Sequence, residues 1–300
     1  MLVRSDLKPF QRMVATDASL DFAEQVAKLA GLPFDRDQAR TEAASLEATI
    51  FSDVCKLTDL SPEEFRFEAG AYFQTRVFAM RDDQGRGTIA LDRTFEYWIS
   101  CLCLLSAVAT FETLSEREMA RLSGQMDRTL NLFVDGSGFE RSREEMKVYL
   151  VRYAHLLNIS EGLARAMLVF TLCHEIAHHL LDHLSGPPSS DQEFEADQIA
   201  AERFFRIVDA GESARSSTAY VDPKISGAPL ILAELMLLFE EWFAAAYGET
   251  ESASDRHPGA SERLERLVPV FADRLGETAQ EIVHGFAAGI GDLRAMLVQR

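Results

Sequence analysis

The sequence has few cysteines and no pair of them in metal-binding or redox spacing. Four cysteines stand at positions 55, 101, 103 and 173 of a 300-residue chain, and none forms a CxxC motif. This number is too small for a disulfide framework, so we expect reduced thiols in a reducing compartment. The absence of paired cysteines therefore excludes a disulfide-stapled secreted scaffold and predicts a cytoplasmic protein.

Positive charge and long hydrophobic runs are also scarce. The chain has 30 Lys and Arg against 48 Asp and Glu, a formal net charge of −18, which disfavours binding to nucleic acid or to anionic lipid. The segment 1–22 carries charges throughout and lacks the apolar stretch of a secretory signal. The longest charge-free apolar run, 97–111, is shorter than the roughly 20 residues that cross a bilayer. It is interpreted as a buried helix, and no membrane span is predicted.

Helical periodicity with recognisable caps covers most of the chain. The predicted helices are 19–30, 36–52, 94–111, 115–133, 140–157, 160–184, 191–210, 227–247, 261–275 and 277–298. The exception is 65–92, where alternation, aromatic residues and the turn sequence DDQGRG predict two or three strands. The predicted fold class is therefore α+β, mostly helical with one small antiparallel-containing sheet at about 65–92. The predicted division is a helical region 1–60 before a domain 61–300, or one continuous domain 1–300.

One stretch is unusually rich in histidine. Four of the seven histidines lie between positions 174 and 183, and they include the motif HExxH, formed by His174, Glu175 and His178. Residues four apart on a helix share a face one turn apart, so both imidazoles can bind a single metal ion. Glu175 borders the same site and can accept a proton from a water molecule at the metal. The motif predicts one Zn²⁺ per chain.

A catalytic zinc site needs a third protein ligand and an open coordination position. Glu193 and Asp197 lie four apart on the next predicted helix, so Glu193 can complete a His₂Glu set while Asp197 holds a ring nitrogen of a histidine ligand. Two alternatives stay open, because Glu195 can serve as the ligand after a small shift and Ser190 with Glu193 fits a helix capping box. His183 is five residues past His178, about 140° round the helix, so His183 and His179 are expected at the surface or behind a ligand, outside the ligand set.

This combination of motifs resembles the gluzincin group of zinc metallopeptidases. The segment EFEADQIAA, 193–201, is most similar to the family of the CAAX-prenyl and heat-shock membrane proteases. That family also has a His-Pro with an arginine six residues after the histidine, as His257, Pro258 and Arg263 have here. Soluble phage-exclusion and repressor-cleaving metallopeptidases share the HExxH and ExxxD-like parts, and they fit better because no membrane span is predicted.

The resemblance is firm over 160–205 and 255–268 and weaker over 70–92. It implies a soluble zinc endopeptidase with a zincin-like active-site helix. It implies that His174, His178 and Glu193 are the zinc ligands. It also implies that Glu175 is the general base and that Asp197 supports a histidine ligand without binding the metal itself. It further implies that His257 or Arg263 stabilises the tetrahedral oxyanion, and that the strands near 70–92 receive an extended substrate by strand addition. The predicted partners are a protein or peptide substrate and, for a latent activity, a regulatory partner.

Two other interpretations of these residues stay open. The ExxH pattern of di-iron carboxylate bundles occurs at Glu175 and again at Glu281 with His284, and Glu112 and Glu145 are candidate further ligands. The other interpretation is a catalytically silent regulatory or binding protein whose metal only stabilises the fold. Structural zinc sites are usually closed and rich in thiolates, and they need no base, so the intact Glu175 favours catalysis.

Overall fold

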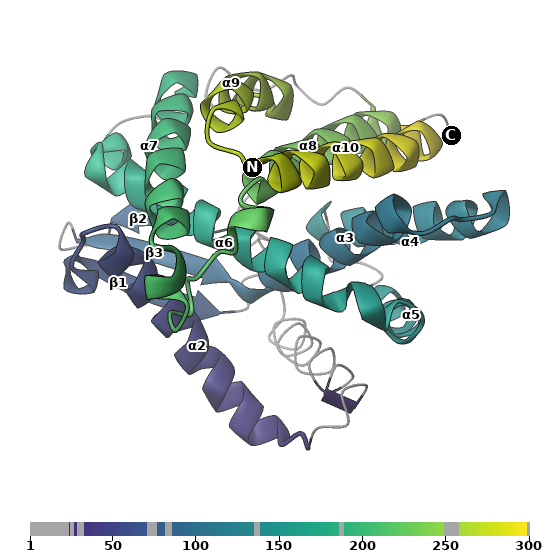
Figure 1. The fold of residues 1–300 in the computed structure, drawn as a ribbon, viewed down its shortest axis with the longest axis horizontal. Helices are drawn as coiled ribbons and strands as arrows, with labels where there is room; N and C mark the ends of the chain where they lie inside the picture. The colour runs from purple at the N-terminus through teal and green to yellow at the C-terminus, as the bar shows by residue number, and fades with distance from the viewer. Residues whose placement is uncertain are drawn as a thin grey trace.

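The computed structural model describes residues 33–70, 77–81, 86–134, 139–185, 189–248 and 258–298, together with Glu24, Ala27 and Lys28. Its helices are α2 (Arg36–Leu57), α3 (Arg93–Phe111), α4 (Glu116–Val134), α5 (Phe139–Arg152), α6 (Leu157–Leu180), α7 (Ser190–Asp209), α8 (Ala228–Tyr247), α9 (Ala260–Ala272) and α10 (Glu277–Val298). Its strands are β1 (Phe65–Gly70), β2 (Val77–Arg81) and β3 (Gly87–Asp92). The predicted class, α+β and mostly helical with one small sheet, is confirmed (Figure 1). Most of the predicted helix 19–30 lies outside the described residues.

The three strands form one mixed sheet in the order β1-β3-β2. β1 runs parallel to β3, and β2 pairs antiparallel to β3, with Val77 opposite Leu91 and Arg81 opposite Gly87. The central strand β3 is almost wholly buried. β2 is an edge strand that packs against α6, so the sheet lies directly against the helix that carries the HExxH motif.

α6 is the central helix of the fold and crosses the middle of the molecule in Figure 1. It packs against α2, α3, α7 and α8 as well as against the sheet. By length and composition, α3 and the segment 154–180 are long and apolar enough to cross a membrane. However, 72% and 67% of their most apolar windows lie buried inside the fold, as in core helices.

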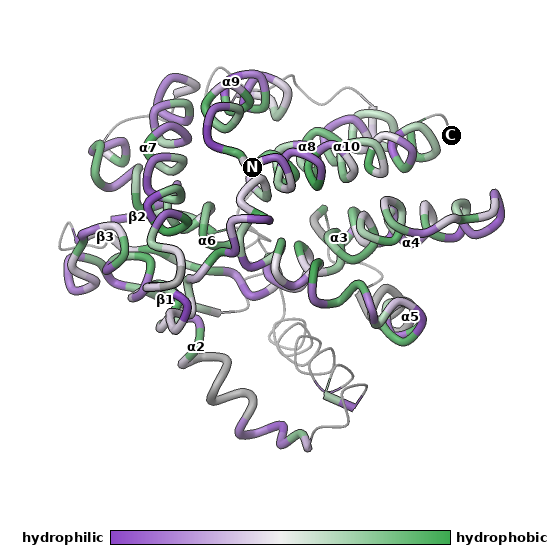
Figure 2. Tube along the Cα trace, viewed as in Figure 1, coloured by the Kyte–Doolittle hydropathy of each residue, from purple (hydrophilic) through white to green (hydrophobic). Residues whose placement is uncertain are grey.

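Helices α2, α7 and α9 pack around α6 and the sheet. In Figure 2, hydrophilic and hydrophobic residues alternate along α7 and α9, as expected for helices with one face on the core and one in solvent. α2 packs on β1, α6 and α7, and the Phe51 ring stacks on Phe67 with ring centroids 4.7 Å apart. Glu47 of α2 also accepts two hydrogen bonds from Arg93, at 2.6 and 2.7 Å. α2 therefore shares its core with the elements that follow it.

Candidate metal centre

Two helices bring three possible metal ligands together. α6 presents His174 and His178 on one face, with their Nε2 atoms 3.1 Å apart. From α7, the Glu193 carboxylate lies 3.4 Å from Nε2 of His174 and 3.7 Å from Nε2 of His178. All three side chains are buried, and one donor atom from each lies within 4.8 Å of the other two. Among the described residues, this is the group of histidine and acidic side chains that can hold a metal ion.

The donor set fits zinc, which binds imidazole nitrogen and carboxylate oxygen. Nδ1 of His174 faces Oδ1 of Asp197 at 2.9 Å, although the ring is not well aligned for a hydrogen bond. A proton on Nδ1 suits this negative neighbour, which leaves the lone pair of Nε2 directed at Glu193 and His178. The arrangement is that of a ligating histidine supported from behind by a carboxylate.

Asp197 is itself held in place by a bidentate contact. Nε and Nη2 of Arg263 donate to its two carboxylate oxygens at 2.8 and 2.5 Å. Burial raises the pKa of Asp197, but the Arg263 guanidinium and His174 outweigh it and lower the pKa to about 2. Conversely, burial lowers the pKa of His174, but Asp197 and Glu193 raise it to about 9. The two carboxylates that raise this pKa also give the pocket the negative charge that favours a metal cation.

Glu175 has the electrostatic environment of a residue that exchanges protons near neutral pH. Burial raises the pKa of Glu175 to about 7; the charge of His174 opposes this shift and the charge of Glu193 adds to it. Its carboxylate also accepts a hydrogen bond from the backbone N–H of Ala79, in edge strand β2. Efficient general bases have pKa values close to the working pH, and this one lies beside a strand edge.

The segment that builds this site is similar to a known family. Residues 150–284 match the model of the Peptidase U49 family. The match spans the three candidate ligands, Glu175, Asp197 and Arg263, and it supports a peptidase, that is, a hydrolase. No curated protein and no solved structure matches the chain. The more specific resemblance to the prenyl, heat-shock, phage-exclusion and repressor-cleaving proteases therefore stays a prediction.

Within this Peptidase U49-like region, the other candidate residues have different surroundings. Glu195 does not join the ligand group, because its Oε2 atom lies 3.1 Å from Nε2 of His183. Arg263, predicted near the reacting carbonyl, has Asp197 as its partner. His257 lies outside the described residues. The Glu195–His183 contact is not anticipated by the helical spacing, because α6 ends at Leu180 and the chain then turns.

The predicted capping box at the start of α7 is wrong in its position. Ser189 accepts a hydrogen bond from the backbone N–H of Gln192, and the Gln192 side chain accepts one from the N–H of Ser189. The box thus begins one residue before the predicted pair, Ser190 and Glu193. The Glu193 carboxylate is thus not part of the box and faces the two histidines of α6.

The residues proposed for a di-iron site do not come together. Glu112 lies 2.7 Å from Nε2 of the exposed His155, and Glu145 forms an ion pair with Arg128. Glu281, on α10, joins no ligand group in the described part of the chain. Among the described residues, the HExxH helix therefore finds its partner on α7, not at the C-terminal end of α3, on α5 or on α10.

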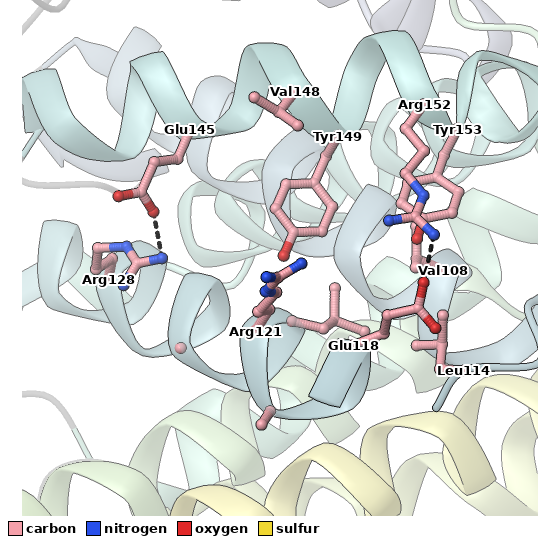
Figure 3. Close-up of a pocket in the computed structure, with 13 residues that line it drawn as sticks. Val108, Leu114, Glu118, Arg121, Arg128, Glu145, Val148, Tyr149, Arg152 and Tyr153 are labelled. Carbon is pink, nitrogen blue, oxygen red and sulfur yellow. Dashed lines mark hydrogen bonds and ion pairs between the residues drawn. The ribbon is translucent and has the colours of Figure 1, made fainter. Parts of the chain in front are cut away.

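A separate groove of about 400 Å³ lies between α4 and α5 (Figure 3). Its two ends are bridged by ion pairs, Arg128 with Glu145 and Arg152 with Glu118. The residues that line it include neither histidine nor cysteine. The groove therefore lacks the donor chemistry of the His-His-Glu group, which remains the candidate centre for hydrolysis.

Proposed function

We propose that this protein is a zinc-dependent endopeptidase. The observation that carries the proposal is the convergence of His174, His178 and Glu193 beside Glu175, in a region similar to a peptidase family. A zinc ion held by these residues would polarise the carbonyl of the scissile peptide bond and acidify the attacking water. The chain's own residues then supply orientation and proton transfer.

Glu175 is the proposed general base. Its carboxylate can take the proton of the attacking water and pass it to the departing amine. Asp197 orients His174, and Arg263 acts on the site by fixing both oxygens of Asp197. A direct contact of His257 with the developing oxyanion stays a prediction.

Edge strand β2 is the proposed docking site for an extended protein or peptide substrate. Its Ala79 N–H already reaches the Glu175 carboxylate, so a peptide paired with this edge would pass next to the proposed base. We also propose a cytoplasmic location, because all four cysteines are free and buried, as in a reducing compartment.

The test begins with elemental analysis of the untagged full chain. We expect about one zinc per chain, lost in His178→Ala, because removal of a ligand leaves an incomplete site. Glu175→Gln should keep the zinc but cleave an unfolded protein substrate at least ~10²-fold more slowly, since it removes only the base.

Three results would contradict the proposal. Cleavage by Glu175→Gln at the parental rate would refute the assigned base. Two irons per chain would instead favour a carboxylate bundle. Zinc without hydrolysis of any polypeptide in a broad substrate set would favour a metal-stabilised binding protein.

A further inference from the structure

Each ring nitrogen of His178 has a polar neighbour. Nε2 faces the candidate metal position beside His174, while Nδ1 lies 3.1 Å from Nδ1 of His183. On the far side of that second ring, Nε2 of His183 lies 3.1 Å from Oε2 of Glu195. His183 is only 7% exposed, whereas the Glu195 side chain is 64% exposed. A row of three side chains thus runs from the candidate metal position to the surface.

One assignment of protons satisfies this row when His178 binds a metal through Nε2. Nδ1 of His178 must then carry its proton and donate it, so Nδ1 of His183 must be the unprotonated acceptor. The proton of His183 therefore sits on Nε2, where it is donated to the carboxylate of Glu195. Each contact fixes the next, and together they leave the Nε2 lone pair of His178 free for the metal.

The chain makes a specific turn to bring His183 back to this position. α6 ends at Leu180, and Asp182 adopts a left-handed backbone conformation with φ of 58°, uncommon for a residue other than glycine. Oγ of Ser185 donates to the Asp182 side chain at 2.8 Å, and Arg81 of β2 forms an ion pair with it. Without this turn, helical spacing would place His183 about 140° away from His178.

The two candidate histidine ligands therefore have equivalent supports on their outer nitrogens. Nδ1 of His174 contacts Asp197, which in turn binds Arg263. In the same way, Nδ1 of His178 contacts His183, which in turn contacts Glu195. We propose that His183, polarised by Glu195, is a positioning residue that holds His178 in its metal-binding orientation and tautomer. This inference rests on the proposed zinc site, and it assigns roles to two residues that bind neither metal nor substrate.

The test measures zinc affinity of the full chain by competition with a chelator. His183→Phe keeps a ring but accepts no hydrogen bond, so we expect about 10–100-fold weaker zinc binding. His183→Asn keeps one acceptor and one donor and should restore most of the affinity. Glu195→Ala, at an exposed position where misfolding is not expected, should weaken zinc binding less than His183→Phe does. His155→Ala is the control, since this exposed histidine contacts Glu112 away from the site and its loss should change nothing.

A second measurement separates positioning from simple packing. In the zinc-loaded parent, nitrogen NMR of labelled histidine should show the proton of His178 on Nδ1 and that of His183 on Nε2. The inference is overturned if His183→Phe binds zinc as tightly as the parent, if His183→Asn is as weak as His183→Phe, or if His183 carries its proton on Nδ1. A parent that binds no zinc would instead refute the proposed function.

Discussion

At the scale of single residues, the charge of Asp197 is central to the site, because it faces His174 on one side and Arg263 on the other. We predict that Asp197→Asn weakens zinc binding about 10–100-fold while leaving the fold intact, since the amide keeps the shape but not the charge. Arg263→Lys should act in the same direction but more weakly, because an ammonium cannot make the bidentate contact. Chelator competition measures both effects.

The control for this prediction is a second arginine–aspartate pair near the same helices. Arg274 donates to Asp209 at 2.5 Å, and both side chains are largely exposed. Arg274→Lys should therefore leave zinc affinity unchanged. Equal losses in Arg263→Lys and Arg274→Lys would show that the effect comes from general destabilisation of the fold.

The limit of sequence-based prediction is visible in these residues. His174 and His178 could be paired from helical spacing alone, and the same rule put Glu193 and Asp197 on one face of α7. For His183, spacing left the surface and a place behind a ligand both open, because its position depends on the left-handed turn at Asp182, which no periodic pattern contains. The contact of Arg263 with Asp197 also depends on how α9 packs on α7, a long-range arrangement that spacing does not determine.

At the scale of elements, the sequence predicts helices better than strand pairing. The predicted helix 227–247 agrees with α8 (Ala228–Tyr247) to within one residue. The agreement is close because caps and periodicity are local properties of the chain. The strands of 65–92 were expected from alternation, but the parallel pairing of β1 with β3 was not. Because β1 pairs with β3, β2 lies at the edge of the sheet next to α6. This strand order depends on contacts between residues far apart in the sequence.

Two glycines of α10 give a matched test of helix packing. A Cβ atom at Gly289 would lie 2.6 Å from Oγ1 and 3.0 Å from the backbone nitrogen of Thr110 on α3, closer than atoms can pack. We predict that Gly289→Ala destabilises the protein by about 1–3 kcal/mol, because α10 must move away from α3. At Gly291 nothing lies within 4 Å, so Gly291→Ala should be neutral or stabilise by up to ~1 kcal/mol. Urea unfolding measures both, and equal stabilities of the two variants would contradict the close packing.

At the scale of the whole molecule, α2, α3 and α6 line a partly open polar pocket of about 150 Å³. Glu96, Glu161 and Arg165 all line it, and the charge of Arg165 opposes that of Glu161 in its effect on Glu96. Burial chiefly, with a contribution from Glu47, raises the pKa of Glu96 from its ordinary value of 4.5 to about 7. Burial also raises the pKa of Glu161, although Arg165 opposes it. The junction of three core helices therefore holds carboxyl groups that resist ionisation.

We predict that the raised pKa of Glu96 in this pocket makes the stability of the whole fold depend on pH. Between about pH 4.5 and 7 the folded chain keeps a proton on Glu96 that the unfolded chain has released, so the free energy of unfolding falls as pH rises. The slope from one such group is at most about 1.4 kcal/mol per pH unit. Glu96→Gln stays neutral in both states, so its stability relative to the parent should rise across this window and level off above it. Urea unfolding of both proteins across the window measures this difference, from which the titrating groups that do not interact with Glu96 cancel. A difference independent of pH would show that Glu96 ionises as freely in the fold as in the unfolded chain.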